Sequence, residues 1–200
     1  MKIVRTDKEL QTPVIDARLR EAGHELVLLP DGIAEDKLIE QIGDADLILM
    51  CYTPITSRII EAAKKLKGIV KYGVGIDAID IPAAVERGIP VVNIPEYAEE
   101  TVAEGAFAML IALAKKMPAI RNTMENNGWA WPEPEWRGSD IAGKTLGIVG
   151  FGKIGKSMAR MANKGFRARV ISFSPHTDST EMEKFGVIKY SSLTDLLSDS

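Results

Sequence analysis

Cysteine and histidine are scarce in this 200-residue sequence. Cys51 is the single cysteine, which excludes a disulfide within the chain and favours a reducing compartment. The two histidines are His24 and His176, so few side chains are available that exchange protons near neutral pH. A reduced, cytoplasmic protein is expected.

Long apolar runs and a strong net charge are also absent. No apolar stretch approaches the roughly 20 residues needed to span a bilayer, and the N-terminus becomes charged after two apolar residues, unlike a signal peptide. With 25 basic and 28 acidic residues the net charge is −3, without a long run of either sign. The sequence therefore predicts a soluble globular protein that binds neither nucleic acid nor membrane.

Short β-branched segments alternate with longer segments of helical period. The predicted strands are Lys2 to Arg5, Glu25 to Leu29, Asp46 to Met50, Gly68 to Tyr72, Pro90 to Asn93, Thr145 to Gly150, Arg169 to Phe173 and Val187 to Tyr190. The predicted helices are Asp7 to Ala22, Glu35 to Ile42, Ser57 to Lys65, Pro82 to Arg87, Thr101 to Lys115, Lys153 to Asn163 and Thr180 to Phe185. This alternation predicts an α/β fold with parallel sheets.

A domain boundary is predicted near residues 95–101. Thr101 and Glu104 have the spacing of a capping box, which would place Thr101 at the N-cap of the longest apolar helix. Residues 128–138 contain all three tryptophans and two prolines, which predicts a loop. Two interpretations of this loop remain open: the tryptophans anchor it to its own domain, or it is an arm at a subunit interface.

The clearest ligand motif is a glycine-rich turn between a predicted strand and a predicted helix. Gly150, Gly152 and Gly155 have the G-x-G-x-x-G spacing within a βαβ unit. Gly150 is expected to make a tight turn, Gly152 to let a pyrophosphate approach the backbone, and Gly155 to let the helix pack against the strand. The amides at the start of that helix would then face the phosphates. We interpret the motif as a dinucleotide site; the alternative is a purely structural turn.

The residue that commonly selects between NAD and NADP is not acidic in this sequence. Ser174 lies nineteen residues after Gly155, where a carboxylate would bind the adenosine ribose. Its hydroxyl has no charge to repel a 2′-phosphate, so either NAD or NADP is expected. His176 is either a partner for that phosphate or a solvated loop residue.

A second glycine-rich turn follows the strand that begins at Gly68. Gly73, Val74 and Gly75 come where the carboxyl ends of parallel strands line a crevice, and consecutive amides in such a turn can bind a carboxylate. The alternative from the residues alone is a simple tight turn.

Four motifs taken together resemble the D-isomer-specific 2-hydroxyacid dehydrogenase family, which includes phosphoglycerate, glyoxylate/hydroxypyruvate and phosphite dehydrogenases. In chain order the motifs are residues 70–80 (VKYGVGIDAID), 88–93 (GIPVVN), 101–104 (TVAE) and 143–155 (GKTLGIVGFGKIG). The resemblance covers essentially the whole chain. It implies an NAD(P)-dependent oxidoreductase that interconverts a small 2-hydroxy acid and a 2-keto acid by hydride transfer. It does not indicate which acid.

The resemblance also implies a domain organisation. Residues 1–98 would form a flavodoxin-like substrate domain that lacks its C-terminal helix. Residues 99–200 would form the first part of a Rossmann dinucleotide-binding domain. A homodimer is implied as well, and no metal is expected.

Individual site residues follow from the same resemblance. Val74 and Gly75 would hold the substrate carboxylate through their amides. Lys153 and Ile154 would lie against the pyrophosphate, and Thr101 would lie near the cofactor.

The family's catalytic residues are a histidine, a glutamate and an arginine in the second half of the Rossmann domain. They are expected to lie beyond Ser200, so no catalytic residue is assigned here, and the 200-residue chain is expected to be inactive. Either the sequence is part of a longer product or it is a short paralogue. A non-catalytic nucleotide-sensing or protein-binding module is the alternative function, and an unrelated Rossmann protein such as a methyltransferase is a weaker third interpretation.

Overall fold

The computed structural model describes residues 1–200 and separates into two units, Met1–Tyr97 and Ala98–Ser200. We describe each unit by itself. None of the helices combines the length and the apolarity needed to cross a membrane.

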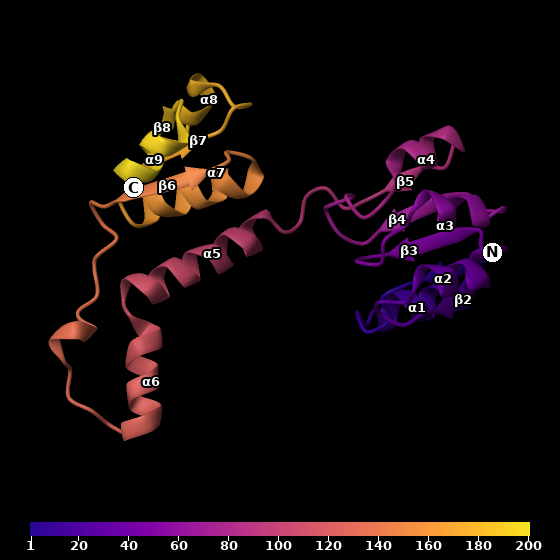
Figure 1. The fold of residues 1–200 in the computed structure, drawn as a ribbon, viewed down its shortest axis with the longest axis horizontal. Coiled ribbons are helices and arrows are strands. Elements are labelled where there is room, and N and C mark those ends of the chain that lie inside the picture. Colours follow the sequence, from indigo (N-terminus) through magenta and orange to yellow (C-terminus); the bar gives the residue numbers. More distant parts are fainter. The chain divides into compact units, whose positions relative to one another are not determined.

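The first unit is built on a five-stranded parallel sheet (Figure 1). Its strands are β1 (Lys2–Arg5), β2 (Glu25–Leu28), β3 (Leu47–Met50), β4 (Gly68–Lys71) and β5 (Val91–Val92). Their order in the sheet is β2-β1-β3-β4-β5, with every neighbouring pair parallel. This is the flavodoxin-like order. The predicted α/β fold is confirmed for this unit.

Helices connect these strands and bury an aliphatic core. They are α1 (Pro13–Glu21), α2 (Glu35–Ile42), α3 (Ser57–Ala62) and α4 (Ile81–Glu86). α3 packs against both α2 and α4. Fully buried Leu38 and Ile59 from the helices share one cluster with Ile48 and Ile69 from the central strands. A sheet buried in this way leaves the loops after its strands as the exposed part that can bind a ligand.

The second unit contains a three-stranded parallel sheet. β6 (Thr145–Val149), β7 (Arg169–Phe173) and β8 (Val187–Tyr190) lie in that order. The helices around it are α5 (Glu99–Ala114), α7 (Lys153–Arg160), α8 (Ser179–Glu183) and α9 (Leu193–Asp199). α7 continues as a π-helix over Met161–Gly165. Three strands that are adjacent in chain order, β6, β7 and β8, are joined by helices and form the first half of a Rossmann sheet, as predicted.

Helix α6 (Met117–Asn127) was not predicted from the sequence, nor was α9. The chain turns between α5 and α6 at Lys116, which has a left-handed φ of 54° (Figure 1). A short 3₁₀ helix, Pro134–Trp136, lies within the loop that was predicted to contain no helix. None of the side chains of α6 is fully buried, and its apolar residues Met117, Ile120 and Met124 form only a narrow stripe among polar residues.

Two predicted helix starts are wrong. The first helix begins at Pro13 rather than at Asp7, because Asp7 has a φ of 57° and its carboxylate binds backbone amides of another loop. Thr101 is not an N-cap: α5 begins at Glu99, with Ala98 at the N-cap, and Thr101 lies inside the first turn. The capping-box spacing was present, but the helix begins two residues earlier.

Candidate functional site

The first candidate site is an open pocket of about 370 Å³ in the first unit. Its wall includes Cys51 and Tyr52, which follow β3, and Lys71 at the end of β4. The glycine-rich turn Gly73–Gly75 also lines it, together with Asp77, Ala78 and Tyr97. The pocket therefore lies at the carboxyl ends of two neighbouring parallel strands, where open α/β sheets bind their ligands.

The turn aims two amides away from the protein. The carbonyl of Gly73 accepts a hydrogen bond from the Ile94 amide at 3.0 Å, and the carbonyl of Val74 accepts one from Asn93 Nδ2 at 2.7 Å. Because a trans peptide is planar, the N–H groups of Val74 and Gly75 point opposite to those carbonyls. Neither amide donates to a protein acceptor, and both residues are exposed. Two adjacent free donors of this kind suit a carboxylate.

Two titratable groups beside the pocket remain protonated near neutral pH. Burial raises the pKa of the Tyr72 hydroxyl, and the negative charge of Asp7 raises it further. Burial also raises the pKa of the Cys51 thiol. The ammonium of Lys71 donates to the Cys51 carbonyl. The Tyr72 hydroxyl donates to the Thr6 carbonyl at 2.9 Å. These contacts give Lys71 and Tyr72 structural roles, and we assign neither as a proton donor.

The second candidate site is the glycine-rich turn between β6 and α7. Gly150 has a φ of 90°, which L side chains rarely adopt, and its amide donates to the Phe173 carbonyl of β7 at 2.8 Å. A Cβ on Gly155 would lie 2.4 Å from the Gly150 carbonyl oxygen, so α7 approaches the strand too closely for any side chain there. A Cβ on Gly152 would meet no atom within 4 Å. The space beside Gly152 is therefore open, and we call the turn from Gly150 to Gly152 the cradle.

Helix α7 begins directly after this cradle. Gly152 is its N-cap residue and has no side chain to bind the amides of the first turn. Lys153 and Ile154 are the first two helical residues; Lys153 Nζ lies 3.9 Å from a carboxylate oxygen of Glu99, and Ile154 is partly exposed. Amides at a helix start carry a partial positive charge, so this end of α7 favours an anion.

The first turn of α5 packs along α7. Glu100 accepts a hydrogen bond from Ser157 Oγ at 2.7 Å and pairs with Arg160. Thr101 follows Glu100 and is exposed. α5 is therefore attached to the helix that begins at the cradle.

Ser174, which follows β7, is buried. Its hydroxyl lies 3.1 Å from Thr177 Oγ1, and Lys189 Nζ donates to the Thr177 carbonyl at 2.7 Å. His176 lies in the same loop and is exposed. The other histidine, His24, directly precedes β2 in the first unit, and neither histidine lines the pocket there.

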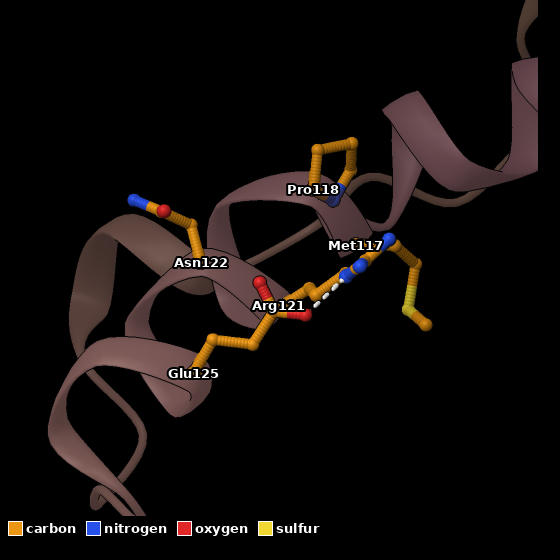
Figure 2. Close-up of a pocket in the computed structure, with 5 residues that line it drawn as sticks. All are labelled: Met117, Pro118, Arg121, Asn122 and Glu125. Carbon is orange, nitrogen blue, oxygen red and sulfur yellow. Dashed lines mark hydrogen bonds and ion pairs between the residues drawn. The ribbon is translucent and has the colours of Figure 1, made fainter.

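A second hollow lies along α6 (Figure 2). All its lining residues come from this one helix, and Arg121 pairs with Glu125 across it at 2.7 Å. With its charges paired, and with lining residues from a single helix, this groove is not assigned a chemical role.

Sequence reasoning overlooked one residue beside the pocket. Asp7, predicted as helical, is fully buried and accepts hydrogen bonds from the amides of Cys51, Tyr52 and Thr53. The signal that could have found it is an acidic residue directly after a buried strand.

The fold and the two turns together define an α/β protein with a flavodoxin-like unit followed by half of a Rossmann sheet. Residues 4–191 match the family described as D-isomer specific 2-hydroxyacid dehydrogenase, catalytic domain. The chain belongs to this family.

Known relatives carry several activities. The chain is 36% identical over 170 residues to D-3-phosphoglycerate dehydrogenase of Methanocaldococcus jannaschii, covering 84% of this chain and 32% of that protein. It is 38% identical over 169 residues to glyoxylate reductase of Korarchaeum cryptofilum, covering 82% and 49%. The matched region thus spans a third to a half of these relatives.

Solved structures share the fold. The TT0316 protein of Thermus thermophilus has a TM-score of 0.87 and 30% identity, covering 100% of this chain and 62% of that one. An acyclic imino acid reductase in complex with NADPH and D-Arg has a TM-score of 0.82 and 28% identity, covering 100% and 63%. D-lactate dehydrogenase of Aquifex aeolicus, complexed with NAD and lactic acid, has a TM-score of 0.81 and 27% identity, covering 99% and 58%.

Proposed function

We propose that this chain forms the substrate-binding unit and the first part of the dinucleotide-binding unit of an NAD(P)-dependent oxidoreductase. The reaction is the interconversion of a small 2-hydroxy acid and its 2-keto acid. Residues 1–98 bind the acid, and residues 99–200 bind the dinucleotide. The observation that carries the proposal is the pair of free amides at Val74 and Gly75, in a protein whose other glycine-rich turn fits a pyrophosphate.

The substrate carboxylate is held by the Val74 and Gly75 amides. Their carbonyls are bound on the far side by Asn93 and Ile94, so the donors are oriented before the ligand arrives. Donors fixed in advance lower the free-energy cost of ordering the site on binding.

The dinucleotide pyrophosphate is held at the start of α7. Gly152 leaves the space, the amides of Lys153 and Ile154 provide the donors, and Gly150 and Gly155 maintain the turn. Thr101 lies on the helix that packs beside α7. When bound, the reduced dinucleotide would supply the hydride to the 2-keto acid, and the oxidised form would accept it from the 2-hydroxy acid. The relatives with bound NADPH and with bound NAD support this assignment.

Ser174 supports the use of both NAD and NADP. No carboxylate stands at this position to repel a 2′-phosphate, and no arginine stands there to attract one. We therefore propose that the chain binds both dinucleotides with similar affinity.

The proton donor and the cation that clamps the substrate come from outside these residues. Reduction of a 2-keto acid needs a proton donor with a pKa near the working pH, which typically contributes about 10²- to 10⁴-fold to the rate. Neither histidine of the chain lines the pocket. Binding the ground state without stabilising the transition state does not accelerate the reaction.

The experiment separates binding from turnover in the purified 200-residue chain. We expect fluorescence titration to show NADH binding, and we expect no NADH or NADPH oxidation above background with glyoxylate, hydroxypyruvate or pyruvate. Absence of NADH and NADPH binding would contradict the nucleotide assignment. Robust turnover would contradict our placement of the proton donor.

We further propose that the chain is a homodimer that associates through α5, α6 and the tryptophan loop. Met109, Leu113 and Met117 are more than half exposed, and Trp129 and Trp131 are 73% and 74% exposed with their ring centroids 5.3 Å apart. Exposed aromatic and methionine side chains are enriched at interfaces.

The dimer is tested by light scattering after size-exclusion chromatography. The expected mass is twice the 21.8 kDa of the chain, falling to that of a monomer in the Trp129→Ser, Trp131→Ser double variant. A monomeric wild-type chain would contradict the dimer, and a variant that stays dimeric would exclude this surface.

A further inference from the structure

One peptide group in the wall of the pocket is held between two opposite charges. The peptide that joins Cys51 to Tyr52 directs its carbonyl to the ammonium of Lys71 and its N–H to Asp7 Oδ2, the latter at 3.1 Å. Because the carbonyl and the N–H of a trans peptide point in opposite directions, the cation and the carboxylate lie on opposite sides of it. A reversed peptide would bring its oxygen against the carboxylate and its N–H against the ammonium, so both charges oppose the reversal.

Asp7 is specialised for this contact. It is 1% exposed and has a φ of 57°, a strained conformation for a residue other than glycine. Its carboxylate also accepts hydrogen bonds from the amides of Cys51 at 2.9 Å and Thr53 at 3.2 Å, and from the hydroxyls of Thr53 at 2.9 Å and Thr6 at 2.6 Å. Burial acts to raise the pKa of Asp7, and the hydrogen bonds from Thr6, Cys51 and Thr53 outweigh it, so the pKa lies below its ordinary value.

Lys71 connects this peptide to the other wall of the pocket. It is buried, and its ammonium lies 5.4 Å from the centre of the Tyr52 ring. A Cβ on Gly73 would lie 2.9 Å from Lys71 Cε, so the lysine stem runs directly beneath the turn that carries the free amides. Lys71 therefore contacts both the segment after β3 and the turn after β4.

We propose that Asp7 and Lys71 are positioning residues that together fix the Cys51–Tyr52 peptide and so set the shape of the carboxylate pocket. This inference rests on the proposed function, because it assumes that the Val74 and Gly75 amides bind the substrate carboxylate. Asp7 does not line the pocket, whereas Lys71 lines it and acts through its hydrogen bond to the Cys51 carbonyl. Each acts on the wall that contacts the substrate.

The experiment measures oxalate binding to the full chain by the NMR shifts of the Val74 and Gly75 amides. Oxalate is a small dicarboxylate that resembles a 2-keto acid. The variants are Asp7→Asn, Lys71→Met and Lys71→Arg. The matched control is Asp46→Asn. Asp46 also accepts a hydrogen bond from a backbone amide, that of Lys2 at 2.8 Å, but it lies at the amino ends of the strands, away from the pocket.

We expect Asp7→Asn and Lys71→Met each to weaken oxalate binding at least fivefold, Lys71→Arg to retain most of it, and Asp46→Asn to stay within twofold of wild type. A second readout is hydrogen exchange at the Tyr52 amide, which should accelerate at least tenfold in Asp7→Asn and remain unchanged in Asp46→Asn. A general loss of stability would not produce this local pattern.

Three outcomes would overturn the inference. If wild type binds oxalate and both Asp7→Asn and Lys71→Met bind it within twofold, the pair does not position the wall, and the proposed function stands. If Asp46→Asn weakens oxalate binding equally, the effect of the other variants is a general loss of stability. If wild type does not bind oxalate, the carboxylate site itself fails, and this inference with it. Should Asp7→Asn not fold, the two Lys71 variants decide.

Discussion

The two glycine-rich turns of this chain look alike in the sequence but need glycine for different reasons. At Gly150 and Gly155 the requirement for glycine comes from the backbone. Gly150 has a φ of 90°, and Gly155 packs directly against the carbonyl oxygen of Gly150. At Gly73 the neighbour is the flexible stem of Lys71, and the φ of Gly73 is not positive. Backbone cannot move away from a new side chain, whereas a lysine stem can. The turn that contains Gly150 and Gly155 is therefore constrained by its backbone, whereas the turn that contains Gly73 depends on the side chains around it.

The largest expected effect tests this difference directly. Gly155→Ala places a Cβ 2.4 Å from the Gly150 carbonyl oxygen. Overpacking against an atom that cannot yield should lower the free energy of unfolding of the second unit by about 3 kcal/mol. The matched variant Gly73→Ala meets a side chain at 2.9 Å and should cost about 1 kcal/mol. Thermal melting of both variants makes the comparison, and equal losses would contradict it.

The next variant separates binding from folding in the turn that contains Gly150 and Gly155. Gly152→Val fills open space, so the fold should persist, while the side chain occupies the place of the pyrophosphate. We expect NADH affinity to fall more than tenfold by calorimetric titration, with the melting temperature nearly unchanged. Gly105→Ala is the control, because its new methyl group also meets no atom within 4 Å. Unchanged affinity in Gly152→Val would exclude the Rossmann interpretation of the turn.

Acid should weaken the segment after β3 through Asp7, whose carboxylate binds the amides of Cys51 and Tyr52. Because the pKa of Asp7 is lowered in the folded protein, its carboxylate contributes stability above its ordinary pKa of 3.8, and this stability is lost as the pH falls through the lower folded value. Asp7→Asn should therefore melt several degrees lower than wild type at neutral pH, and the gap should narrow below about pH 4. Melting curves recorded against pH provide the measurement. A constant gap would show that Asp7 does not act through its charge.

The smallest effect concerns the choice of cofactor at the end of β7. Ser174→Asp introduces a negative charge that should repel a 2′-phosphate and shift the affinity ratio toward NADH by a few-fold. Parallel titrations with NADH and NADPH measure the ratio, and Ser174→Asn serves as the uncharged control. A wild-type preference for NADH above a hundredfold would show that another residue selects the ribose.

Periodicity and spacing were sufficient for the architecture. The strands Lys2–Arg5, Arg169–Phe173 and Val187–Tyr190 begin and end where the sequence predicts, because each contains two adjacent β-branched residues and lies between turn residues. The G-x-G-x-x-G spacing likewise predicted a turn at Gly150 and close packing at Gly155, and both are present. Local rules decide these features, so a local pattern reveals them.

The missed features have tertiary causes. α6 buries no side chain fully, and only a narrow apolar stripe of Met117, Ile120 and Met124 marks it in the sequence. Thr101 had the pattern of a cap, yet the helix begins at Glu99, and its first turn packs against α7 through Glu100.

In the candidate pocket, too, some features follow from the local sequence and others only from the tertiary structure. The sequence by itself determined that glycines follow β4 and that Val74 and Gly75 are candidates for a carboxylate site. Only the tertiary structure decided that Asp7 and Lys71, 64 positions apart in the numbering, hold one peptide of a third segment. The physical reason is that parallel strands bring their carboxyl ends together whatever their separation in the chain, so charges that follow β1 and end β4 meet the segment after β3 at an edge that no local sequence pattern records.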